Sequence, residues 1–248
     1  MPIPRVIYQT WCTNQFHPLI YNKINNMIKM NPGYDYRLFT DDDMDEFVNA
    51  YYPGEIADAY NKLNIIVAKA DFWRYLILYK YGGVYLDIDS TILKPLDSFI
   101  RKDDEAIISA EGTETQLQWA LIFSQEHPIL KRTIDFIVDN IQNNRYTKVG
   151  EMTGPFIYTK AINSIHSELF NEDLRHDVLY NKKYNKEYVD NESENILDIV
   201  FNKDNIKYRF FGRDFCSNLQ FKYPEHQLLY ETKRHWHNDE REMAMLKN

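Results

Sequence analysis

Ala70 to Ser90 reads A-D-F-W-R-Y-L-I-L-Y-K-Y-G-G-V-Y-L-D-I-D-S, and this stretch decides the fold class because three local signals follow one another in it. A mostly apolar helix comes first, and Gly82-Gly83 offers the left-handed residue that commonly ends a helix. A short apolar strand follows, which ends in Asp87 and Asp89. Side chains alternate faces along a strand, so these two carboxylates are predicted to point the same way.

Two carboxylates on one face suit a hard divalent cation. Mg²⁺ and Mn²⁺ prefer oxygen ligands, and a site with one or two protein carboxylates usually completes its shell with substrate phosphates. Asp87 and Asp89 are therefore predicted to hold a metal-bound diphosphate. The alternative is an aspartate pair that serves only the turn after the strand.

Two charged residues interrupt the apolar helix. Asp71 and Arg74 lie three positions apart and so share one helix face. They form either a modest ion pair within the helix or contacts to a ligand. Charges placed in an apolar helix cost free energy unless they are paired or used, which favours the ligand contacts.

Strands alternate with helices on both sides of this stretch. Apolar periodicity, helix-start signals and Gly or Pro breaks locate the segments. The predicted strands are Val6–Trp11, Tyr34–Phe39, Ala106–Ala110, Trp119–Ser124 and Tyr208–Phe211, and the predicted helices are Pro18–Met30, one from Thr40 toward Tyr51, Asn64–Tyr81 and Pro128–Asn140. The polar region 171–205 is predicted to be a surface excursion with short elements. This order predicts an α/β fold with a central mixed, mostly parallel sheet covered on both faces, and with ligands outside the carboxyl ends of the strands.

Composition limits the class of protein. The chain has 248 residues, of which 44% are hydrophobic and 15% aromatic, enough for one large domain over residues 1–248 rather than two small ones. A formal net charge of −8 argues against a nucleic-acid partner. Cys12 and Cys216 are too far apart for a zinc or redox motif, which favours a reduced, cytoplasmic compartment. No signal peptide and no transmembrane segment of about twenty apolar residues is expected.

The motif of Asp87 and Asp89 resembles the DXD signature of nucleotide-sugar-dependent glycosyltransferases. The helix with Asp71 and Arg74 narrows the resemblance to family 32, which includes capsular-polysaccharide sugar transferases and the yeast initiating mannosyltransferase. The large clostridial glucosylating toxins show a similar D-x-x-R helix ahead of their DXD. The start I-P-R-V-I-Y-Q-T-W, Ile3–Trp11, is similar to the family pattern I-P-K-x-I-H-Q-x-W, with Tyr in place of the frequent His. The resemblance implies a GT-A-type α/β/α sandwich.

A bare D-x-D is weak evidence, because the run Asp41-Asp42-Asp43 contains another one. That run follows Thr40, so it is better explained as the start of a helix. Thr40 and Asp43 have the spacing of a capping box, and acidic side chains favour a helix N-terminus.

The resemblance assigns roles around the diphosphate. It implies that Asp89 ligates the metal directly, while Asp87 contacts the donor's ribose or reaches the metal through water. It also implies that Asp71 hydrogen-bonds the hydroxyls of the donor sugar and that Arg74 approaches the sugar or the diphosphate.

The resemblance also points to nucleotide contacts at the first strand. Trp11 would stack on the base, although a tryptophan there could equally belong to the core. Gln9 and Thr10 are candidates for hydrogen bonds to the nucleotide. Thr153-Gly154-Pro155 resembles a family element near the sugar, and an ordinary helix start is the equal alternative. His127-Pro128 is predicted to be a structural helix start.

Glycosyltransferases of this fold often add a late histidine to the metal. His235 and His237, in the segment R-H-W-H-N-D, are the candidates, with surface histidines as the alternative. His235 precedes a Trp, as in the family's H-W-x-x-S-W-like ending, but the Ser-Trp pair is missing here.

Together these observations lead us to expect a metal-dependent, retaining glycosyltransferase. It would use Mn²⁺ or Mg²⁺ to transfer a hexose from a nucleotide diphosphate sugar, UDP-hexose ahead of GDP-mannose, to a glycan hydroxyl. Peripheral membrane association is expected if that acceptor is lipid-linked. Two other classes stay open. A sugar-nucleotide nucleotidyltransferase usually has a Gly-rich basic loop after its first strand, where this chain has W-C-T-N-Q. A non-catalytic carbohydrate-binding protein would suit the many aromatic residues.

Overall fold

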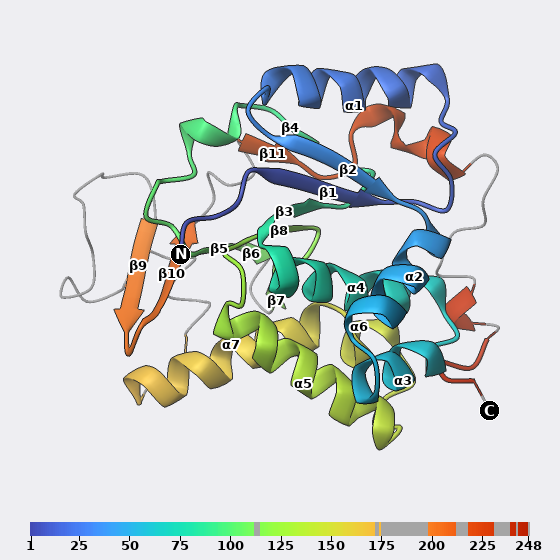
Figure 1. The fold of residues 1–248 in the computed structure, drawn as a ribbon, viewed down its shortest axis with the longest axis vertical. Coiled ribbons are helices and arrows are strands. Elements are labelled where there is room, and N and C mark those ends of the chain that lie inside the picture. Colours follow the sequence, from blue (N-terminus) through green and yellow to red (C-terminus); the bar gives the residue numbers. More distant parts are fainter. Residues whose placement is uncertain are drawn as a thin grey trace.

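A computed structural model describes residues 1–111, 115–171, 174, 198–211, 218–230, 239–241 and 243–247. Within them, a seven-stranded sheet has the order β2-β1-β3-β8-β5-β10-β9 (Figure 1). The strands are β1 (Val6–Thr10), β2 (Asp35–Phe39), β3 (Gly83–Leu86), β5 (Ala106–Ile108), β8 (Ala120–Phe123), β9 (Asp198–Lys203) and β10 (Ile206–Phe211). The pairings leave five strands in one direction, with β8 and β9 opposed to them. The predicted mixed, mostly parallel sheet is confirmed.

Helices and a short second sheet cover the two faces of this sheet (Figure 1). On one face lie α1 (Pro18–Met30) and the antiparallel pair β4 (Thr91–Ile92) and β11 (Leu219–Gln220). The other face carries α2 (Asp41–Tyr51), α3 (Glu55–Lys62), α4 (Ile66–Tyr81), α5 (Pro128–Gln142), α6 (Val149–Met152) and α7 (Pro155–Phe170). The short elements are β6 (Ala110–Glu111), β7 (Thr115–Gln116) and the 3-10 helices η1 (Leu96–Ser98) and η3 (Pro224–Tyr230). This arrangement is the expected α/β/α sandwich.

The alternation of side chains along the strands separates two cores. In β3, Val84 faces the smaller core under α1, whereas Tyr85 faces the larger core under α4. In β8, Ile122 and Leu121 divide in the same way. The pattern fixes the register of the central strands, because a slip by one residue would exchange the two sets of side chains.

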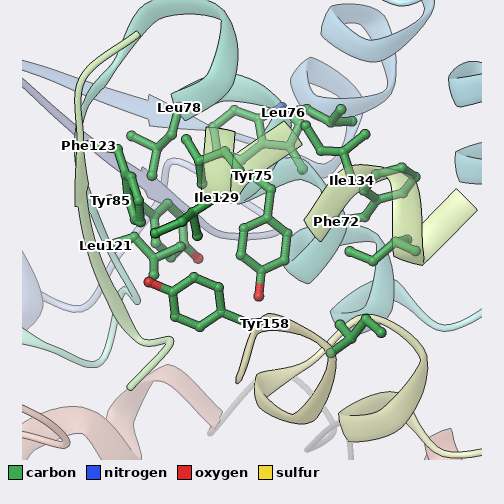
Figure 2. Close-up of a cluster of buried hydrophobic side chains, with 14 of the residues drawn as sticks. Phe72, Tyr75, Leu76, Leu78, Tyr85, Leu121, Phe123, Ile129, Ile134 and Tyr158 are labelled. Atoms are coloured by element: carbon green, nitrogen blue, oxygen red, sulfur yellow. The ribbon is translucent and has the colours of Figure 1, made fainter. Parts of the chain in front are cut away.

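Helix α4 lies in the larger core and is covered almost all round (Figure 2). Its phenol Tyr75 stacks on Tyr158 of α7 with ring centroids 5.7 Å apart. An apolar surface on every side is typical of a buried helix. Asp71 and Arg74 belong to this helix, so the fold forces both charges out of water. No helix among the described residues is long and apolar enough to cross a bilayer.

One strand in the polar region was not predicted. β9 occupies Asp198–Lys203 and pairs antiparallel with β10 at the edge of the sheet. Its buried residues Ile199 and Phe201 lie two positions apart, but Val200 between them is also apolar, so the sequence shows no clear alternation of polar and apolar residues here. The rest of the predicted surface excursion falls mostly outside the described residues.

The junction between α4 and β3 depends on two glycines, as predicted. Gly82 ends α4 with φ 63°, and Gly83 begins β3 with φ 115°. A Cβ on Gly83 would lie 2.8 Å from the carbonyl oxygen of Val6, which is backbone of the neighbouring β1. The chain can therefore pass from a buried helix directly into a central strand only without a side chain here.

We expect Gly83→Ala to destabilise the protein through both its backbone angle and this clash. Gly54→Ala is the matched control, because Gly54 has φ 91° but open space around its Cβ position. Gly83→Ala should lower the free energy of unfolding by at least about 1 kcal/mol more than Gly54→Ala. Chemical denaturation of both variants measures the difference. Equal losses would contradict the close approach of Gly83 to β1.

Candidate active site

A cavity of about 390 Å³ lies at the carboxyl ends of β1 and β3. Its walls come from the residues that follow these strands, from the first half of α4, from the residues before β8 and from the segment after β11. Asp71, Arg74, Asp87 and Asp89 all line it. The structure thus brings all four residues predicted to be catalytic into one site at the expected edge of the sheet.

Asp87 follows β3 directly and is held by its neighbours on both sides. Its amide donates to the carbonyl of Trp119 at 2.8 Å, and its carbonyl accepts from the Gln9 side chain at 3.1 Å. Its carboxylate accepts from the Tyr85 hydroxyl at 2.8 Å and pairs with Arg74 at 3.0 Å. Asp87 is therefore fixed before any ligand arrives.

The geometry predicted for the aspartate pair was wrong in one respect. β3 ends at Leu86, so Asp87 and Asp89 do not continue the strand. They lie in a tight turn, in which the Ser90 amide donates to the Asp87 carbonyl at 2.9 Å. The turn, rather than strand alternation, presents both carboxylates to the cavity.

Asp89 has an unsatisfied carboxylate oxygen. The residue is only 6% exposed, and its Oδ1 atom has no hydrogen-bond partner in the described structure. Burial, together with the nearby charge of Asp87, raises the pKa of Asp89 to about 7. A buried oxygen without a donor costs free energy. A cation bound at this atom would remove that cost.

The donor set fits Mg²⁺ or Mn²⁺. Asp87 and Asp89 supply only carboxylate oxygens, which such hard cations prefer. Within the described ranges, no group of three or more His, Cys, Asp or Glu side chains could hold a metal. The remaining ligands would have to come from a bound phosphate, from water or from the part of the chain that is not described.

Arg74 joins the helix to the turn. Its Nη2 atom lies 2.9 Å from a carboxylate oxygen of Asp71 and 3.0 Å from one of Asp87. Its guanidinium also lies 4.7 Å from the centre of the Tyr85 ring. Asp71 and Arg74 are 5% and 4% exposed, so the ion pair within the helix, one of the two alternatives, is present and is buried. Their contacts to a ligand stay a prediction. Burial raises the pKa of Asp71 to about 6 despite the adjacent Arg74.

Gln118, which precedes β8, and Thr153, which follows α6, support this bridge. Thr153 donates its hydroxyl to Asp71 at 3.4 Å, and Gln118 donates its amide to the Tyr75 hydroxyl at 2.6 Å and to the Thr153 carbonyl at 3.3 Å. The carbonyl of Gln118 accepts from Arg74 at 3.3 Å. The Thr-Gly-Pro element is therefore both a helix start, at Pro155, and a neighbour of the site. Gln118 had no sequence signal.

The residues predicted to contact the nucleotide separate into two groups. Thr10 and Trp11 line the cavity, and Trp11 packs edge to face against Tyr230 with centroids 5.7 Å apart. Gln9 is buried beneath the site, where it holds the Asp87 carbonyl and accepts from the Tyr36 hydroxyl at 3.0 Å. Its place in the structure indicates a positioning role.

Other predicted features fall around the cavity. The capping box of Thr40 and Asp43 is present as expected, but Asp41 also lines the cavity. His127 is the predicted helix start, since its ring accepts from the Ile129 amide at 3.2 Å.

His235 and His237 lie outside the described residues, so their part in metal binding stays a prediction. Tyr230 and Asp239, the described residues on either side of that segment, both line the cavity.

The raised pKa of Asp71 predicts a pH-dependent stability. Between its ordinary pKa of 3.8 and about 6, the folded protein holds a proton that the unfolded chain has released, so this contribution to stability falls as pH rises. Asp71→Asn cannot titrate. The parent should therefore lose on the order of 3 kcal/mol relative to Asp71→Asn between pH 4 and pH 7, as measured by denaturation. If the difference in unfolding free energy between the parent and Asp71→Asn did not change with pH, the raised pKa of Asp71 would be contradicted.

Comparison with known families agrees with this geometry. Residues 19–106 match the family described as "Glycosyltransferase sugar-binding region containing DXD motif", a span that includes α4, β3 and the aspartate turn. The fold is similar to that of the PaToxG glycosyltransferase, with a TM-score of 0.56 and 19% identity over 68% of this chain and 72% of that one. This likeness concerns the fold alone.

Two curated relatives come from yeasts. Inositol phosphoceramide mannosyltransferase 3 of Schizosaccharomyces pombe is 33% identical over 53% of this chain and 36% of its own length. The initiation-specific alpha-1,6-mannosyltransferase of Candida albicans is 29% identical over 65% of this chain and 52% of its own length. The chain thus spans about a third to a half of these relatives. The comparisons confirm the resemblance seen in the sequence: the chain carries the DXD-containing sugar-binding region of glycosyltransferases and is similar to family 32 mannosyltransferases.

Proposed function

We propose that the protein is a metal-dependent glycosyltransferase that transfers a hexose from a nucleotide diphosphate sugar to a hydroxyl group. The observation that carries this proposal is the unsatisfied, buried oxygen of Asp89 next to Asp87 in a cavity of about 390 Å³. In a turn with a purely structural role, a buried carboxylate oxygen would be expected to have a hydrogen-bond partner. The matching family, named for a sugar-binding region with this motif, supports the same conclusion.

Different residues of the cavity would bind the diphosphate, the sugar and the base of the donor. Asp87 and Asp89 would hold Mn²⁺ or Mg²⁺, and a bound divalent cation stabilises the charge that develops on a departing phosphate. Asp71 accepts from Thr153 through Oδ2 and faces the cavity, so it can also accept hydrogen bonds from sugar hydroxyls. Trp11 offers an aromatic surface at the cavity wall for the base.

Arg74 serves this site mainly as a positioning residue. It is 4% exposed, and its guanidinium already binds the carboxylates of Asp71 and Asp87. Removing it would leave two carboxylates near each other without a counter-charge, which is costly in a buried site. Arg74 therefore keeps the sugar-binding and metal-binding carboxylates at a fixed separation.

We propose mannose as the transferred sugar, because both relatives described above are named mannosyltransferases. GDP-mannose then takes the place of UDP-hexose as the first donor to test. The acceptor is proposed to be a hydroxyl of a glycan or of a lipid-linked sugar. Retention of the donor's anomeric configuration and a cytoplasmic location remain predictions.

Release of free nucleoside diphosphate separates this function from its alternatives. The protein is incubated with GDP-mannose and UDP-hexoses in the presence of Mn²⁺. A glycosyltransferase releases the diphosphate, slowly to water and faster to an acceptor. A nucleotidyltransferase instead makes sugar nucleotide from a sugar phosphate, and a carbohydrate-binding protein does neither.

Asp89→Ala should abolish transfer and Mn²⁺-dependent nucleotide binding while the fold is retained. Loss of electrostatic stabilisation of this kind commonly costs about a hundredfold or more in turnover. Asp42→Ala is the matched control, because Asp42 is exposed and lies between Asp41 and Asp43, the other D-x-D of the chain. Turnover is measured with the donor that the parent enzyme uses. Near-normal turnover in Asp89→Ala, or an equal loss in Asp42→Ala, would refute the assignment.

If His235 or His237 ligates the metal, the enzyme should prefer Mn²⁺ to Mg²⁺. Imidazole nitrogen suits Mn²⁺ better than Mg²⁺, so the parent enzyme should turn over faster with Mn²⁺. His235→Ala, or failing that His237→Ala, should narrow this preference. The ratio of the two rates is the measurement. If the ratio of the Mn²⁺ and Mg²⁺ rates is unchanged in both variants, neither histidine ligates the metal, and its ligands are Asp87, Asp89, phosphate and water.

A further inference from the structure

The segment that follows β11 brings a lysine to the cavity that no sequence motif marks. Lys222 lines the cavity and lies immediately before the buried Tyr223. Its backbone has φ 51°, in the left-handed region that a residue with a side chain seldom adopts. Such a conformation persists only where the surrounding structure imposes it, and it concentrates at functional sites.

Contacts on both sides of Lys222 impose this conformation. Phe221 stacks on Trp119 with ring centroids 5.3 Å apart and planes 14° from parallel. Tyr223 donates its amide to the Asp89 carbonyl at 3.2 Å and its hydroxyl to the Ile88 carbonyl at 3.1 Å. The backbone of Lys222 is thereby tied to the aspartate turn.

Lys222 lines the same cavity as Asp87 and Asp89 but forms no ion pair with either of them. Within the described ranges, no carboxylate lies within ion-pair distance of its ammonium group, which instead sits 5.1 Å from the centre of the Phe221 ring. The ammonium is therefore free to bind an incoming anion.

The cations that line the cavity differ in availability. Among the described lining residues they are Arg74 and Lys222. Arg74 is 4% exposed and its charge is already offset by Asp71 and Asp87, although its Nε atom has no hydrogen-bond partner. The same wall carries several carboxylates, and a diphosphate brings more negative charge. Lys222 is the cation in the described lining that can offset this charge directly.

We propose that Lys222 is a catalytic residue that binds the phosphate oxygens of the departing nucleoside diphosphate, beside the metal held by Asp87 and Asp89. This inference rests on the proposed transferase function. In that reaction the bond between the sugar C1 and the phosphate oxygen breaks, and its electron pair stays on the oxygen. The acceptor oxygen forms the new bond to C1, and its proton leaves to the phosphate or to water. Lys222 offsets the charge that forms on the leaving oxygen.

Three substitutions separate the charge of Lys222 from its backbone. Asn and Gly tolerate a positive φ, so Lys222→Asn and Lys222→Gly should fold and melt like the parent. Lys222→Arg keeps the charge. Lys94→Asn is the matched control, because Lys94 is exposed and follows β4, the strand that pairs with β11.

Calorimetric titration with nucleoside diphosphate, monophosphate and unphosphorylated nucleoside, each with Mn²⁺, tests the proposal. Lys222→Asn and Lys222→Gly should lose about tenfold or more in affinity for the diphosphate. They should lose no affinity for the nucleoside, and their kcat should fall. Lys222→Arg and Lys94→Asn should bind the diphosphate like the parent.

Two different failures can be told apart. If the parent binds no nucleoside diphosphate with Mn²⁺, the proposed function falls and this inference falls with it. If the parent binds it and the Asn and Gly variants bind it equally well with unchanged kcat, the function stands and the role of Lys222 is overturned. An equal loss for the nucleoside would likewise overturn it, because the defect would then concern the shape of the cavity and not the phosphate charge.

Discussion

The buried guanidinium of Arg74 is the interaction on which the site depends. It lies within 3.0 Å of the carboxylates of Asp71 and Asp87, which come from a helix and from the turn after a strand. Without the guanidinium these two buried carboxylates would repel each other or take up protons, and the bridge lowers that cost. It also sets their spacing. In the proposed function, Asp71 would serve the sugar and Asp87 the cation.

The surrounding fold holds this bridge in place. Gly82 and Gly83 let α4 turn directly into β3, so the helix charges and the aspartate turn face the same cavity. Gln9 holds the Asp87 carbonyl from the next strand, and Tyr223 holds the Asp89 carbonyl from the distant C-terminal part. The turn is thus preorganised. Among the described residues the Oδ1 atom of Asp89 has no hydrogen-bond partner, which fits the proposed cation.

Local signals in the sequence predicted the part of the site that lies within a single stretch. Asp71, Arg74, Asp87 and Asp89 lie within nineteen residues of one another, and helix spacing, glycines and an apolar strand mark them. Gln118 and Lys222 had no comparable signal, and Thr153 was marked only by the resemblance of Thr153-Gly154-Pro155 to a family element. The contact of Thr153 with Asp71 spans 82 residues, and that of Tyr223 with Ile88 spans 135. Such contacts depend on how distant strands pair, and spacing along the chain does not reveal them. The turn geometry at Asp87 was missed because strand alternation cannot locate the last residue of a strand.

We infer that the aspartate turn binds a cation tightly only together with a diphosphate. Electron paramagnetic resonance of Mn²⁺ measures this directly, by titrating the ion into the protein with and without nucleoside diphosphate. We expect weak binding of Mn²⁺ alone and much tighter binding with the diphosphate, and the metal should raise the affinity for the diphosphate by the same factor. Equal Mn²⁺ affinity in the two titrations would contradict it.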